Sequence, residues 1–143
     1  MLIGVDPLLS GELLKILDEM GHGDQLLLVD RNYPAYAAGK PVVRLGEVST
    51  DRAAEAILSV FPLDSFVRHP LEKMEVEGDP AQVTEAHAGM LAVARSRHGE
   101  ALEIGGVPRH DFYQRAKNAY AVVQTLEQRP YACFILQKGV VND

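Results

Sequence analysis

Residues 21–30 read Gly-His-Gly-Asp-Gln-Leu-Leu-Leu-Val-Asp. Residues 25–29 are almost all apolar and do not alternate with polar residues, which is typical of a parallel strand buried on both faces. A histidine between two glycines precedes this run, and an aspartate follows it. The segment therefore predicts a buried strand with a polar loop at each end.

An amphipathic helix is predicted immediately before this strand. Leu13, Leu17 and Met20 fall at helical spacing, and Ser10 is suited to cap the first turn. Gly21 is suited to end the helix in the left-handed conformation. The chain thus enters the strand from a short helix.

Helical and extended patterns continue to alternate downstream. We expect strands at 42–45, 72–77, 101–104 and 133–136, and helices at 50–61, 80–97 and 108–123. Pro62 ends the second helix, and Pro108 is placed as the first residue of the last one. This alternation favours a single three-layer α/β domain over residues 1–143, a central sheet with flanking helices.

The composition excludes several classes of protein. The 143 residues fit one domain, and a formal net charge of -6 without a basic cluster argues against a nucleic-acid partner. A single cysteine excludes an intramolecular disulfide and a thiolate-rich zinc site. The N-terminus does not resemble a signal peptide, and no apolar run is long enough to span a membrane, so we expect a cytoplasmic protein without a membrane partner.

The loop around His22 is the first candidate for chemistry. Gly21 and Gly23 allow a tight turn that leaves the imidazole open to a ligand, and Asp24 and Asp30 are nearby in the sequence. A structural interpretation is also open, in which the glycines serve only the helix exit, His22 caps the preceding carbonyls and Asp24 is solvated.

A second candidate lies late in the chain. Arg109 offers several fixed donors for sugar hydroxyls or a developing oxyanion, and Tyr131 offers a flat apolar face with one polar tip. The alternatives are a solvated Arg109 and a Tyr131 that packs in the core. The remaining histidines, at 69, 87, 98 and 110, are expected mostly at the surface, and His110 beside Arg109 is the one to test.

Several blocks of the sequence, in order, resemble the sugar-isomerising RbsD/FucU family, which contains the fucose mutarotases and ribose pyranases. These blocks are Leu8-Leu9, Glu12-Leu13-Leu14, Met20-Gly21-His22-Gly23-Asp24, Asp30, Asn32-Tyr33-Pro34, Phe112-Tyr113, Tyr131 and Gln137-Lys138-Gly139-Val140. The similarity covers nearly the whole chain. Two of these features are closer to the fucose mutarotase branch than to the ribose pyranase branch. They are the segment Met20 to Asp24 and the position of Arg109 ahead of Phe112-Tyr113.

The resemblance implies a cofactor-free isomerase that interconverts ring forms of a free monosaccharide, most simply L-fucose or a similar sugar. It implies His22 as the acid/base group and Asp30 as its polar partner or a sugar-hydroxyl acceptor. Arg109, Tyr131, Cys133 and Asp24 are the expected substrate-binding residues, with a loop-stabilising hydrogen bond as the alternative for Asp24. It also implies a homo-oligomer, commonly a decameric ring of two pentamers, with sites near subunit boundaries.

Two positions depart from the family pattern. The family usually has asparagine where this chain has Cys133, two residues after Tyr131, and a thiol is a weaker donor and acceptor than an amide. The usual Thr-Gly-Glu becomes Thr125-Leu126-Glu127. These changes bear on which sugar is recognised rather than on the presence of His22 and Asp30.

The sequence also bears on three other functions. A module that binds a monosaccharide or its phosphate without catalysis fits the loss of the asparagine. A metal site would have only His22, Asp24 and Asp30 as ligands, a thin set for zinc. A dinucleotide-binding fold is excluded because Asp30-Arg31-Asn32-Tyr33-Pro34 stands where a glycine-rich phosphate loop is required.

Overall fold

The computed structural model describes residues 1–142, and its centre is a six-stranded sheet. The strands lie in the order β2 (Val42–Gly46), β5 (Ala121–Thr125), β1 (Gln25–Val29), β6 (Phe134–Gln137), β3 (Leu71–Met74) and β4 (Gly105–Val107). β6 runs antiparallel to β1 and β3, and the other neighbouring pairs are parallel. The predicted strand at 25–29 is confirmed and has partners on both edges.

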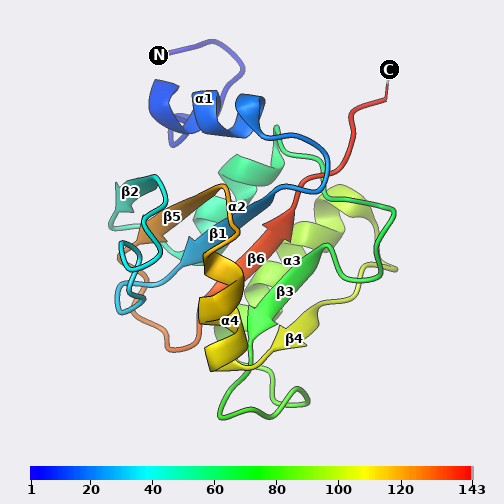
Figure 1. Cartoon of the computed structure of the whole chain (residues 1–143). Helices are drawn as coiled ribbons and strands as arrows, with labels where there is room; N and C mark the ends of the chain where they lie inside the picture. Colours follow the sequence, from blue (N-terminus) through cyan, green and yellow to red (C-terminus); the bar gives the residue numbers. More distant parts are fainter. Residues whose placement is uncertain (143) are drawn as a thin grey trace.

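Helices cover both faces of this sheet (Figure 1). They are α1 (Gly11–Glu19), α2 (Thr50–Leu58), α3 (Glu85–His98) and α4 (Arg109–Ala116). α1, α2 and α3 contribute to one apolar core, and α4 packs against the opposite face of the sheet. The predicted three-layer α/β architecture is therefore confirmed.

Strand β1 supplies both cores. Leu26 and Leu28 lie in the core beneath α2 and α3, whereas Leu27 and Val29 lie in the core beneath α4. Successive side chains of a strand point to opposite faces, so a strand covered on both sides has no place for a polar residue. Each of these four side chains is fully buried, which contributes about 1.5–3 kcal/mol per residue.

The first helix begins where the sequence predicts and ends differently. The Ser10 hydroxyl accepts a hydrogen bond from the Leu13 amide at 3.2 Å. The prediction that Gly21 adopts the left-handed conformation is wrong, because the chain leaves the helix at Met20 in an extended conformation (ψ 138°). The left-handed residue is Gly23 (φ 90°), whose amide donates to the Lys138 carbonyl after β6.

The predicted helix at 108–123 is wrong beyond Ala116. α4 ends at Ala116, and residues 121–125 form β5 between β2 and β1, inside the sheet. Alanines and valines at 116, 119, 122 and 123 fit a helical period, but β5 is buried over its whole length. Pairing with two parallel neighbours outweighs the local preference.

Other boundaries shift by a few residues. α3 begins at Glu85 after the Thr84 cap, so residues 80–84, which were predicted to be helical, lie outside the helix. β4 occupies 105–107 rather than 101–104, β3 covers 71–74 rather than 72–77, and β6 starts one residue late. The strand at 42 and the helix at 50 begin as expected. Within residues 1–142, no helix has the length and apolar character needed to cross a membrane.

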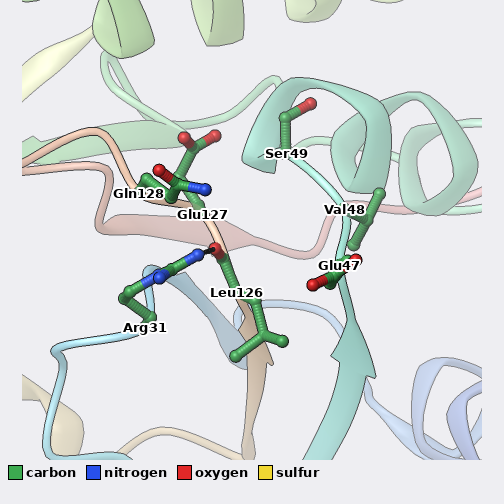
Figure 2. Close-up of a pocket in the computed structure, with 7 residues that line it drawn as sticks. All are labelled: Arg31, Glu47, Val48, Ser49, Leu126, Glu127 and Gln128. Atoms are coloured by element: carbon green, nitrogen blue, oxygen red, sulfur yellow. Dashed lines mark hydrogen bonds between the residues drawn. The ribbon is translucent and has the colours of Figure 1, made fainter.

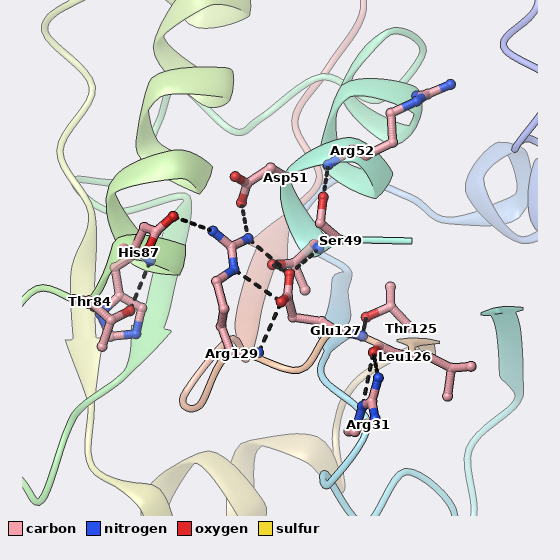
Figure 3. A network of polar contacts seen from close by, with 12 residues as sticks. Arg31, Ser49, Asp51, Arg52, Thr84, His87, Thr125, Leu126, Glu127 and Arg129 are labelled. Carbon is pink, nitrogen blue, oxygen red and sulfur yellow. Dashed lines mark hydrogen bonds and ion pairs between the residues drawn. The ribbon is translucent and has the colours of Figure 1, made fainter. Parts of the chain in front are cut away.

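An ion pair between the buried Glu127 and the partly exposed Arg129 fixes the segment that leads into β6 (Figure 3). The Glu127 carboxylate accepts hydrogen bonds from the Arg129 side chain at 2.9 and 3.0 Å and from the Thr50 amide at 3.0 Å, at the first turn of α2. Arg129 also donates to Asp51 at 3.1 Å. Although burial disfavours the charged form, the hydrogen bonds from Arg129 and Thr50 lower the pKa of Glu127 to about 2.

We predict that Glu127→Gln lowers the free energy of unfolding at pH 7 by roughly 3 kcal/mol. The folded-state pKa of Glu127 lies below the unfolded one, so its contribution is fully present above about pH 4.5 and is lost as the pH falls toward 2. Urea unfolding at several pH values measures this: the difference between parent and variant shrinks as the pH falls. Glu100→Gln, at an exposed position, is the matched control. A difference that stays constant from pH 7 to pH 3 contradicts the assignment.

Candidate functional site

Polar side chains collect at the carboxyl edge of the parallel strands. Asp30 follows β1, Arg109 follows β4 after one proline, and Tyr131 and Cys133 precede the antiparallel β6. These positions fall on the same edge of the sheet, the usual location of ligand sites in such folds. All four residues line one pocket of about 350 Å³. The structure therefore brings together four of the six residues predicted from the sequence.

Asp30 is the buried carboxylate of this pocket, with 6% of its surface exposed. Its Oδ1 accepts hydrogen bonds from the amides of Asn32 at 3.0 Å and Tyr33 at 3.1 Å. Burial raises the pKa of Asp30 above its ordinary value, and these amides together with the Cys133 thiol offset part of that rise. A carboxylate with a raised pKa is a stronger base than a solvated aspartate, which suits it to proton transfer.

Cys133 lies beside Asp30 and is only 3% exposed. Burial, together with the charge of Asp30, raises the pKa of the Cys133 thiol well above its ordinary value. The group therefore stays protonated at neutral pH, and it is a weak hydrogen-bond donor rather than a nucleophile.

Aromatic rings form the wall around Arg109. The Arg109 guanidinium carbon lies 6.0 Å from the centre of the Tyr113 ring, and the Tyr33 and Tyr113 ring centres are 5.7 Å apart. This is the range of a cation–π contact, which orients the guanidinium.

Six lining residues were not assigned as site residues from the sequence: Asn32, Tyr33, Met74, Glu77, Tyr113 and Pro130. Asn32 and Tyr33 directly follow Asp30, and Tyr113 lies one helical turn after Arg109. Their closeness in the sequence to Asp30 and Arg109 could have indicated that these three residues line the same pocket. Met74 ends β3 and Glu77 lies in the turn that follows, and the position of β3 in the sheet is a tertiary property.

The backbone of this pocket is strained at two points. Glu77 (φ 51°) and Tyr131 (φ 58°) are the two non-glycine residues in the left-handed region within residues 1–142, and both line the pocket. Such conformations cost of order 1 kcal/mol or more each and concentrate at functional sites. The strain marks this pocket independently of its polar side chains.

His22 lies at the opposite edge of the sheet. It precedes β1, whereas Asp30 follows it, and a five-residue strand spans about 17 Å. The His22 side chain is 47% exposed, its Nε2 lies 3.1 Å from Asp64 Oδ1, and its ring centre lies 5.4 Å from that of Phe66. Within one chain, His22 therefore does not reach the pocket that contains Asp30.

Asp64 is the polar partner of His22, and the sequence analysis missed it. Burial opposes its ionisation, but hydrogen bonds from the Phe66 amide, Gln137 and His22 lower the pKa of Asp64 below its ordinary value. Its Oδ2 accepts from the Gln137 side chain at 2.9 Å. An acid inside the otherwise apolar stretch before Ser65 was the available sequence signal.

Asp24 belongs to the His22 loop and not to the pocket. Its Oδ2 accepts a hydrogen bond from the Gly21 amide at 2.7 Å, which ties the two ends of the loop together. This is the loop-stabilising contact that was the alternative to sugar binding. The metal ligand set His22, Asp24 and Asp30 does not meet within one chain, and the described residues contain no group of three or more His, Cys, Asp or Glu arranged for a metal ion.

A second hollow of about 340 Å³ adjoins the Glu127 network (Figure 2). Its charged groups are Glu47, Glu127 and Arg31, and Arg31 Nε donates to the Leu126 carbonyl at 3.0 Å. The start of α2, a natural anion site, is occupied by the Glu127 carboxylate. Arg31 shares this hollow with two carboxylates, so the hollow is poorly suited to a phosphate.

A third hollow, of about 530 Å³, lies beneath residues 63–70. Asp64, Arg68, His98 and Glu103 are among its lining residues, but no side chain of the strand ends at the carboxyl edge contributes to it. None of its lining residues has the left-handed backbone seen at Glu77 and Tyr131 beside Asp30.

The fold and the pocket define a three-layer α/β protein with a polar, aromatic-walled site at the carboxyl edge of its sheet. Residues 3–141 match the model of the RbsD / FucU transport protein family, and the chain belongs to this family.

Individual relatives are similar over nearly their full length. The L-fucose mutarotase of Haemophilus influenzae strain 86-028NP is 43% identical, with 98% of this chain and 97% of the relative covered. The crystal structure of the Streptococcus pneumoniae fucose mutarotase in complex with L-fucose is 36% identical, with a TM-score of 0.90 and 99% and 100% coverage. The structure of Atu2016, described as a putative sugar binding protein, is 37% identical, with a TM-score of 0.95 and 99% and 97% coverage.

We predict that Cys133, the single cysteine, reacts at least tenfold more slowly with iodoacetamide in the native protein at pH 8 than in 8 M urea, because it is buried and its thiolate is disfavoured. Mass spectrometry of the alkylated fraction over time measures both rates. Equal rates in the two conditions contradict the placement of the thiol.

Proposed function

We propose that this protein is a monosaccharide mutarotase that interconverts the α and β anomers of L-fucose. The observation that carries the proposal is the pocket in which the buried Asp30 carboxylate, the Arg109 guanidinium and three tyrosine rings converge. Polar groups of this kind suit sugar hydroxyls, and aromatic faces suit the apolar face of a sugar ring. The full-length similarity to L-fucose mutarotases supports the choice of sugar.

The reaction needs only proton transfers. The anomeric hydroxyl loses a proton, the bond between C1 and the ring oxygen breaks, and the ring oxygen gains a proton, which leaves an open-chain aldehyde. Rotation about the bond between C1 and C2 and the reverse transfers close the ring with the hydroxyl on the other face. Positioned acid/base groups contribute about a hundred- to ten-thousandfold in rate to such steps.

The residues of the pocket have distinct proposed roles. Asp30 accepts a hydrogen bond or a proton from a sugar hydroxyl, and Arg109 donates to sugar oxygens. Tyr131 forms the far wall and contributes its hydroxyl, directly or through a water, to the proton relay. Cys133 takes the position next to Asp30, where a thiol recognises a hydroxyl more weakly than an amide does. Asp24 acts indirectly, through the conformation of the His22 loop.

His22 is the proposed acid/base partner of Asp30, and in this proposal it comes from a second copy of the chain. The two side chains lie at opposite edges of one sheet, so a site that contains both needs two subunits. The exposed His22 ring and the exposed Phe66 beside it suit such a contact. A homo-oligomer, with the decamer of two pentamers as the expected form, satisfies this requirement. We also propose that this oligomer is located in the cytoplasm.

A sugar-binding protein without catalysis is the alternative. Two observations favour it: Cys133 in place of the usual asparagine, and the similarity to a putative sugar binding protein. This alternative predicts tight sugar binding with no faster exchange between anomers.

Proton NMR saturation transfer between the anomers of L-fucose, D-ribose, D-galactose and L-rhamnose separates the two functions. We expect faster exchange of L-fucose with the parent protein and loss of at least a hundredfold of the catalysed rate with His22→Ala or Asp30→Asn. Unchanged exchange with a folded His22→Ala variant contradicts the role of His22. Binding without exchange for every sugar selects the alternative function.

The assembly of the site from two subunits gives a separate prediction. Co-expression of His22→Ala and Asp30→Asn chains, each inactive by itself, produces mixed oligomers in which about one site in four combines an intact His22 with an intact Asp30. We expect roughly a quarter of the parent rate from this mixture. Co-expression of Asp30→Asn with Arg109→Ala is the matched control: both side chains belong to the pocket of the same chain, so every pocket in this mixture lacks one of them and no intact site forms. Recovery in the control, or no recovery in the first mixture, contradicts the arrangement.

A further inference from the structure

His87 is a buried histidine for which the mechanism above has no role. It lies in the first turn of α3, and none of its surface is exposed, so it is the exception to the expectation that most of these histidines lie at the surface. Its ring centre is 5.8 Å from that of Phe134, with the two rings nearly perpendicular. The side chain does not line the sugar pocket. The sequence signal was its spacing of three and seven residues before the core residues Met90 and Ala94.

Both ring nitrogens of His87 have partners. Nδ1 accepts a hydrogen bond from the Thr84 amide at 3.2 Å, and Nε2 lies 2.9 Å from the Tyr131 carbonyl oxygen. An amide can only donate and a carbonyl can only accept, so the two partners assign the proton to Nε2 of a neutral ring. His87 therefore joins the first turn of α3 to the backbone of a pocket residue.

Tyr131 is the residue that needs such a contact. Its left-handed backbone (φ 58°) is unfavourable for a residue with a large side chain, and such a conformation persists only where the surroundings impose it. The preceding part of the segment is fixed through Glu127 and Arg129 to the start of α2, with His87 and Thr84 nearby on α3 (Figure 3). The hydrogen bond from His87 fixes the peptide group at Tyr131 itself.

We propose that His87 is a positioning residue for the sugar site: its Nε2–H holds the Tyr131 carbonyl, and thereby directs the Tyr131 ring toward the pocket. The inference rests on the proposed function of that pocket. His87 takes no proton from the sugar and acts only through Tyr131.

Two amide substitutions separate this role from support of the helix. His87→Gln can place an amide N–H near the position of Nε2 and keep the bond to Tyr131, while it loses the acceptor at Nδ1. His87→Asn can keep an acceptor near Nδ1 for the Thr84 amide, while it does not reach Tyr131. Both variants exchange the ring for a buried amide, so each is the control for the other. Thr84→Ala removes the hydroxyl that accepts from the His87 amide and weakens the cap of α3 without touching Tyr131.

We expect His87→Asn to lower the catalysed exchange of L-fucose about ten- to a hundredfold and to raise the half-saturating sugar concentration, because small displacements of a positioning group carry penalties of this size. His87→Gln stays within about threefold of the parent rate. Thr84→Ala lowers the unfolding midpoint and leaves exchange unchanged. Should the asparagine variant fail to fold, His87→Leu, which also leaves the Tyr131 carbonyl without its donor, is expected to show the same loss.

The 19F NMR spectrum of protein labelled with 3-fluorotyrosine gives a readout that does not depend on catalysis, with the Tyr131 resonance assigned from Tyr131→Phe. We expect a shift of that resonance in His87→Asn and not in His87→Gln or Thr84→Ala. Equal exchange rates and equal spectra for the Asn and Gln variants overturn the inference, as does a folded His87→Leu that matches the parent. Absence of exchange in the parent itself refutes the proposed function instead, and the fluorine spectra then still test whether His87 positions Tyr131.

Discussion

The burial of β1 on both faces and both edges is the constraint on which the rest of the structure depends. Leu26 to Val29 are fully buried, and the strand pairs with β5 on one side and β6 on the other. If the register of this strand shifted by one residue, each side chain that now points into one core would point into the other. It therefore fixes which residues leave the sheet at each edge, with His22 and Asp24 at one edge and Asp30 at the other.

The direction of β6 completes the site. Because β6 is antiparallel to its neighbours, the residues before it lie at the same edge as the residues after β1 and β4. Tyr131 and Cys133 thus meet Asp30 and Arg109, although about a hundred residues of chain separate Asp30 from Tyr131. The same edge carries the two strained residues, Glu77 and Tyr131, so the polar groups and the backbone strain coincide.

The segment from Glu127 to Cys133 has two different attachments. The ion pair of Glu127 and Arg129 connects it to the start of α2, and the Tyr131 carbonyl connects it to α3 through His87. Neither attachment depends on the sugar. Much of the framework that presents Tyr131 is consequently built before a ligand arrives, which lowers the conformational entropy lost on binding.

Much of the fold could be predicted from the sequence, and the exceptions have specific causes. The strand at 25–29 and the helix capped by Ser10 follow from local apolar period and capping, which act within a few residues. The sequence of β5 predicts a helix because its alanine and valines fit the helical period as well as a buried strand. Only pairing with the neighbouring strands decides between helix and strand. His87 was not predicted as buried because its environment is formed by Phe134 and Tyr131, far away in the sequence.

The sequence by itself determined the chemistry that is available: a histidine in a glycine loop, an aspartate after a buried strand, and an arginine and a tyrosine late in the chain. Local patterns specify residue types and short elements, so these features can be recognised from the sequence alone. Only the tertiary structure decided which of them share a site, because the strand order and the direction of β6 bring Asp30, Arg109, Tyr131 and Cys133 together and leave His22 a strand's length away.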